Sequence, residues 1–86
     1  MKIKDGYLMR EVAGTHVVVP VGATVDFSGM ITLNETGAFL WKELLQDTTE
    51  EKLLAALLEE YEIESDTGKR DIAEFLARLK AADLLE

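Results

Sequence analysis

Hydrophobic residues in this chain follow a strand-like period before residue 34 and a helical period after it. With an interruption at Gly29, alternate positions upstream are occupied by Val25, Phe27, Ile31 and Leu33. Alternation of this kind is typical of a strand with one buried face. Downstream, apolar residues recur at helical spacing, at Leu40, Trp41, Leu44 and Leu45. Since an asparagine side chain can accept a backbone N–H from the first turn of a helix, Asn34 is expected to cap a helix over residues 35–46.

The segment before this strand predicts a hairpin. A strand over residues 7–12 and a second over 16–19 are separated by the turn Ala13-Gly14-Thr15. Pro20 has no backbone N–H, so it is expected at the end of the second strand. In the third strand, Gly29 indicates a bulge or the close approach of another backbone.

Two further helices are predicted in the second half of the chain. Thr48 and Glu51 have the spacing of a capping box. The apolar face of the helix that follows carries Leu54, Leu57, Leu58 and Tyr61. Ser65 or Asp66 can cap the last helix, whose core stripe is Ile72, Phe75, Leu76 and Leu79. Leu84 and Leu85 are expected to fold back on the core.

This order of elements predicts the fold class. Three strands followed by three helices make an α+β fold, a small winged-helix-like domain with a three-stranded antiparallel sheet. A chain of 86 residues suits one core, so residues 1–86 are expected to form a single domain.

Composition excludes several kinds of chemistry. The chain has no cysteine, and therefore no disulfide, thiolate metal site or cysteine nucleophile. His16 is the only histidine, and its place before a valine run favours a strand residue over a general base, which needs a positioned partner. Glu59 and Glu60 are adjacent on a helix and point about 100° apart, so they do not form a catalytic pair. We expect no enzymatic activity, metal or cofactor.

The net charge of −8 is concentrated in residues 43–64, which hold eight acidic residues and one lysine. Such a segment repels a phosphate backbone. The last helix has four basic residues, but Asp66, Asp71, Glu74 and Asp83 offset them. These charges disfavour a winged-helix nucleic-acid-binding protein, which is the alternative function for this order of elements. Salt-dependent retention on DNA would favour it. An inert subunit of a larger complex is a further alternative.

No stretch approaches the roughly 18 apolar residues that a membrane span needs. The N-terminal residues 1–6 carry charges without an apolar run after them, unlike a secretory signal. The expected location is the cytoplasm, without a membrane partner.

The third strand is expected to lie at an edge of the sheet, where its outer backbone groups stay unpaired. If the last helix packs beside that edge, Lys69, Ala73, Ala77 and Lys80 share one flank of its core stripe. The alanines would leave space for a ligand and the lysines would border it. The alternative is an ordinary solvated helix face.

The chain resembles the PqqD family, named for pyrroloquinoline quinone biosynthesis. The resemblance rests on Leu33-Asn34-Glu35-Thr36 at the start of the first helix, with Trp41 after it. Tyr61 matches the tyrosine that ends the second helix, and the apolar stripe and leucine-rich tail match the third. A glycine that often follows the first helix is absent from residues 45–48.

The resemblance implies a non-catalytic peptide-binding module. In this family, the leader segment of a ribosomally made precursor peptide adds to the third strand beside the third helix. A separate enzyme, often a radical S-adenosylmethionine protein, then modifies the peptide. The peptide-binding residues implied here are Val25, Asp26, Phe27, Ser28, Gly29, Met30, Ile31, Lys69, Ala73, Leu76, Ala77 and Lys80. The protein is expected to be a monomer without nucleic-acid partners.

Overall fold

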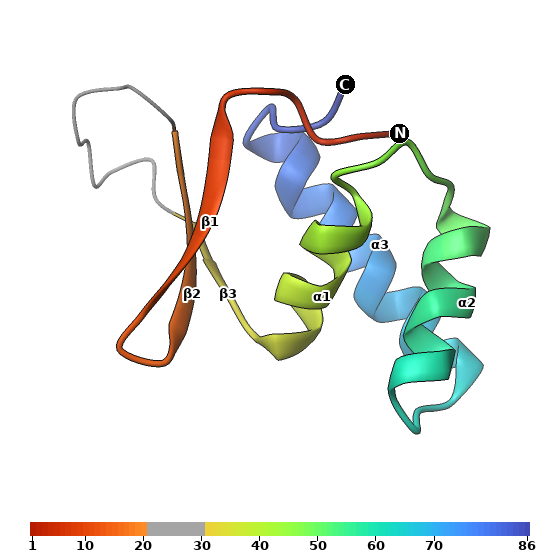
Figure 1. Ribbon diagram of the computed structural model, residues 1–86. Helices are drawn as coiled ribbons and strands as arrows, with labels where there is room; N and C mark the ends of the chain where they lie inside the picture. The colour runs from red at the N-terminus through yellow and green to blue at the C-terminus, as the bar shows by residue number, and fades with distance from the viewer. Residues whose placement is uncertain (21–30) are drawn as a thin grey trace.

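The computed structural model describes residues 1–20 and 31–86 and confirms three strands followed by three helices (Figure 1). The strands are β1 (Tyr7–Val12), β2 (Thr15–Pro20) and β3 (Ile31–Leu33). The helices are α1 (Glu35–Glu43), α2 (Glu50–Glu60) and α3 (Ser65–Ala81). The sheet lies at one side in Figure 1 and α2 at the other, with α1 and α3 between them. The predicted α+β class is therefore confirmed.

The strands form an antiparallel sheet in the order β1-β2-β3. Val12 pairs with Thr15, so Ala13 and Gly14 form a two-residue turn. Both have positive φ, 52° and 80°, as the turn that matches the twist of a hairpin requires. Thr15 therefore belongs to β2, one residue earlier than predicted. Pro20 ends β2, as expected.

β3 is described over three residues, which pair with β2. The pairs are His16 with Leu33, Val17 with Thr32 and Val18 with Ile31. The predicted strand began near Val25. Residues 25–30, including the predicted bulge at Gly29, lie outside the described part of the chain.

The N-terminal cap residue agrees with the sequence prediction for one of the three helices. The Asn34 side chain accepts the Gly37 N–H at 2.8 Å, which confirms the cap of α1. At α2 the cap is Thr49, which accepts the Lys52 N–H at 3.2 Å, so the predicted Thr48–Glu51 box is wrong. At α3 the N-cap residue is Glu64, without a side-chain bond, so neither Ser65 nor Asp66 has the predicted role.

α1 ends earlier than predicted, at Glu43. The Leu44 N–H contacts the carbonyls of both Leu40 and Trp41, at 3.0 and 3.1 Å. This is the tightened last turn by which helices often end. The next residue, Leu45, is 51% exposed and lies outside the core, contrary to its predicted place on the apolar stripe.

The core lies between the sheet and the helices and contains the predicted stripe of α3. Its buried members are Ile3, Val18, Leu33, Leu40, Trp41, Leu44, Leu53, Leu57, Ile72, Phe75, Leu76, Leu79 and Leu84. On α2, Leu58 was predicted inside and is 37% exposed, whereas Leu53 is buried instead. Leu84 folds back into the core, and Leu85 pairs with Ile3, which confirms the predicted return of the C-terminal residues.

No helix in the described residues is long and apolar enough to cross a membrane.

Candidate functional site

The hairpin turn determines which backbone groups of β2 face β3. β1 and β2 are joined by a two-residue turn, and the residues that close such a turn, here Val12 and Thr15, exchange both backbone hydrogen bonds. Bonded and non-bonded pairs alternate along an antiparallel ladder, so Val17 also directs its N–H and C=O at β1. The residues on either side, His16 and Val18, therefore direct theirs at β3.

Thr32 is the residue of the described β3 whose backbone groups point away from β2. Ile31 and Leu33 lie opposite Val18 and His16, so their N–H and C=O groups bond to β2. The N–H and C=O of Thr32 point to the other side. Within residues 1–20 and 31–86, the sheet has no strand beyond β3 on that side. Thr32 thus presents one donor and one acceptor at the edge of the sheet.

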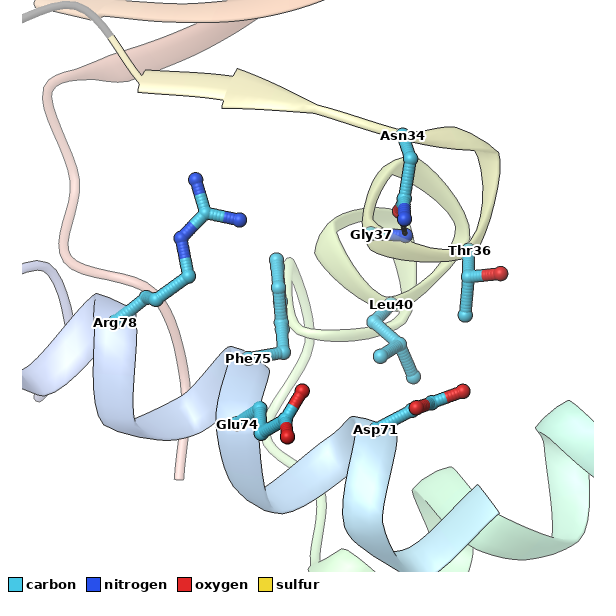
Figure 2. Close-up of a pocket in the computed structure, with 8 residues that line it drawn as sticks. All are labelled: Asn34, Thr36, Gly37, Leu40, Asp71, Glu74, Phe75 and Arg78. Atoms are coloured by element: carbon cyan, nitrogen blue, oxygen red, sulfur yellow. Dashed lines mark hydrogen bonds between the residues drawn. The ribbon is translucent and has the colours of Figure 1, made fainter. Parts of the chain in front are cut away.

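Arg78 of α3 reaches this edge. Its Nη2 donates a hydrogen bond to the Thr32 carbonyl at 2.9 Å, in an exposed position. Figure 2 shows the Arg78 side chain extending from α3 toward β3. The open acceptor of β3 is therefore bonded to a side chain of α3 instead of a neighbouring strand.

Two hollows adjoin Arg78, one on each side. The first has a volume of about 430 Å³ and is lined by Ile31, Thr32, Arg78, Ala81 and Ala82. The second, of about 150 Å³, is lined by Asn34, Thr36, Gly37, Leu40, Asp71, Glu74, Phe75 and Arg78. Both are lined by Arg78, and together they follow one flank of α3 from β3 to the start of α1. We call this pair of hollows the β3–α3 groove.

The helical period explains why these residues of α3 share a flank. Asp71, Glu74 and Arg78 recur at i, i+3 and i+7, and therefore lie above one another on the helix surface. The buried stripe through Phe75 runs beside them. Gly37 leaves room for the cap, because a Cβ on Gly37 would lie only 3.2 Å from Asn34 Oδ1, while its 3.4 Å distance to Phe75 Cε2 would be close to an ordinary contact.

The structure separates the expected helix flank from β3. Lys69 lies in another hollow, with Glu50, Glu51, Leu54 and Ile72, beside α2. Lys69, Ala73, Ala77 and Lys80 are exposed. At 100° per residue they occupy the flank opposite Asp71 and Arg78. The hollow beside β3 is lined instead by Arg78, Ala81 and Ala82, at the C-terminal end of α3.

Two other predicted site residues have clear positions. Leu76 is 2% exposed, so it belongs to the core and offers almost no surface in the described structure. Ile31 lines the first hollow, beside Arg78. The remaining strand residues, 25–30, lie outside the described residues. A binding role for any of these residues stays a prediction.

The β3–α3 groove carries charges of both signs: Asp71 and Glu74 are acidic and Arg78 is basic. Arg78 lies between Asp71 and Glu74 on one side and the alanines at 81 and 82 on the other. Phosphate-backbone binding needs a surface rich in Lys and Arg, and this flank instead mixes signs. In the described residues no group of three or more His, Cys, Asp or Glu side chains is placed to hold a metal ion.

Comparisons with known proteins give two matches. A family described as coenzyme PQQ synthesis protein D matches residues 15–85. The solved structure described as TbiB1 in complex with the TbiA(beta) leader peptide matches with a TM-score of 0.76 and 26% sequence identity. That match covers 100% of this chain and 95% of the TbiB1 chain. No curated protein sequence matches.

Proposed function

This chain belongs to the PqqD family, and from this we propose that it is a non-catalytic module that binds the leader segment of a ribosomally synthesised precursor peptide. The leader adds as a strand beside β3 and lies in the β3–α3 groove. The domain, a cytoplasmic monomer, then presents the peptide to a separate modifying enzyme, such as a radical S-adenosylmethionine protein. TbiB1, which has a similar fold, was solved with a leader peptide.

The observation that carries the proposal is the open edge at Thr32. Strand addition requires a backbone N–H and C=O that face away from the sheet, and a neighbouring surface for the alternate side chains of the peptide. Thr32 directs both groups away from β2, and the hollow of Ile31, Ala81 and Ala82 adjoins it. The alanines carry small side chains, so a peptide backbone can approach α3 closely there. By the sequence prediction, the same edge continues from Ile31 back to Val25.

Hydrogen exchange of single amides tests strand addition directly. In the free protein, the Ile31 and Leu33 amides should exchange slowly, because they bond to β2, while the Thr32 amide exchanges fast. A leader peptide taken from a short reading frame beside the gene for this chain should slow Thr32 exchange, since a peptide carbonyl then accepts that N–H. NMR-detected exchange resolves the three residues.

The helix α2 provides the control for that measurement. Amides over 53–60 are bonded within the helix and should change least when the peptide binds. A peptide that binds tightly and leaves Thr32 exchanging freely would show that strand addition at this edge is wrong.

A second measurement decides which flank of α3 faces the peptide. The double substitution Lys69→Glu and Lys80→Glu should leave the affinity for the leader within about twofold of the wild type, even at low salt. This flank faces away from β3, and exposed charge pairs contribute only about 0.2–1 kcal/mol. A fluorescence anisotropy titration provides the affinities. A several-fold loss at low salt would instead support the lysine flank predicted from the sequence.

A further inference from the structure

Arg78 takes the place of a donor that an added strand would supply. A strand pairing at Thr32 would donate an N–H to its carbonyl and accept its N–H. In the free protein that carbonyl already accepts a hydrogen bond from Arg78 Nη2 at 2.9 Å. A peptide strand in this register therefore competes with the guanidinium for one acceptor.

The surroundings of Arg78 limit where a displaced guanidinium can find a partner. Asp71 and Glu74 line the hollow on one side of Arg78, and Ala81 and Ala82 line the hollow on the other side. Glu74 precedes Arg78 by four residues, a spacing at which helix side chains interact. On the side toward Ile31, the lining residues other than Arg78 are apolar or uncharged. Among residues 1–20 and 31–86, none that lines this side offers Arg78 a charged partner, and a ligand can supply one.

A carboxylate is the group that fits this position. Guanidinium presents paired N–H donors in a plane, which match the two oxygens of a carboxylate. A peptide carboxylate beside Asp71 and Glu74 would be repelled, so attraction is confined to the hollow of Ile31 and Ala82. The groove thus distinguishes an acidic side chain from a neutral one at a single position of the peptide.

We propose that Arg78 is a specificity-determining residue of the β3–α3 groove. When the leader adds to β3, Arg78 releases the Thr32 carbonyl to the peptide backbone and binds a glutamate or aspartate side chain of the leader over the hollow of Ile31, Ala81 and Ala82. This inference rests on the proposed function, because it needs a peptide strand at Thr32.

Selection from random peptides tests the charge preference of Arg78 without a choice of leader sequence in advance. The probe is a display library of random peptides of about ten residues, the length of a long strand. The wild-type protein should enrich peptides with an acidic residue at one position of the strand. The Arg78→Glu variant should enrich peptides with lysine or arginine at that position. Arg70→Glu, an exposed arginine of the same helix, is the matched control and should select as the wild type does.

Affinity measurements with one selected peptide distinguish a specificity role of Arg78 from a purely structural role, in which it only holds α3 against β3. Replacing its acidic residue by the matching amide should weaken binding to the wild type about two- to fivefold, as for an exposed ion pair. The loss should shrink as salt increases. On Arg78→Met, the acidic and amide peptides should bind equally. The amide peptide should bind this variant at least as tightly as the wild type, because the competitor for the Thr32 carbonyl is gone.

The outcomes separate this inference from the proposed function. If Arg78 only braces α3 against β3, Arg78→Met should weaken both peptides by the same factor, and the inference is overturned. Selected peptides that protect the Thr32 amide but show no acidic preference also overturn it, while the proposed function stands. If the wild type enriches no peptide at all, the proposed function fails and the inference fails with it. Thermal unfolding of each variant confirms that the comparison is between folded proteins.

Discussion

Trp41→Ala is expected to destabilise the fold by roughly 3–5 kcal/mol, the range for truncating a large buried aromatic residue. Trp41 is 1% exposed and belongs to the core cluster with Leu40, Leu44 and Leu53. Domains of this kind are stable by only about 5–15 kcal/mol, and small ones lie toward the lower end. The midpoint of thermal unfolding should therefore fall by about 12 °C or more, as followed by circular dichroism.

The neighbouring Lys42 provides the control for this substitution. It lies on the same helix and its side chain is exposed, so Lys42→Ala should move the midpoint little. If Trp41→Ala left the unfolding curve unchanged, the assigned packing of α1 against the core would be wrong.

Thr32→Pro is expected to abolish most leader binding while the domain stays folded. Proline lacks the backbone N–H, and the Thr32 N–H points away from β2, so no bond of the described sheet is lost. Proline is tolerated at sheet edges for this reason. Losing one peptide hydrogen bond, together with the bulk of the ring at the edge, should weaken affinity about tenfold or more.

Thr32→Ala isolates the role of the backbone. It removes the hydroxyl and methyl groups but retains the N–H, so binding should stay close to that of the wild type. Calorimetric titration with the leader peptide compares the three proteins, and their unfolding curves test whether the sheet is intact. Full affinity in a folded Thr32→Pro protein would exclude pairing of the peptide at this N–H.

Local sequence patterns were sufficient for most of the fold, because they report short-range geometry. The change of period at Asn34 located the end of β3 and the start of α1, and the Asn34 side chain caps that helix. The i, i+3, i+4, i+7 stripe of α3 identified Ile72, Phe75, Leu76 and Leu79 as core. Where two neighbouring residues could serve equally well, as with Thr48 and Thr49, the pattern selected the wrong cap.

Packing accounts for the errors at helix edges. Leu45 and Leu58 continue apolar stripes in the sequence, but they are 51% and 37% exposed. α1 ends before Leu45, and α2 turns Leu53 inward in place of Leu58. A hydrophobic period indicates a face about 100° wide or more, and only the neighbouring elements decide where that face ends.

The sequence by itself determined the order of elements, the α+β class, the edge position of the third strand and the family resemblance. The tertiary structure decided which flank of α3 lies beside β3. Both flanks border the same core stripe, so helical spacing alone cannot distinguish the one with Lys69 and Ala73 from the one with Arg78. The contact of Arg78 with the Thr32 carbonyl joins residues 46 positions apart in the chain. No local pattern encodes such a contact, because it depends on how α3 crosses the sheet.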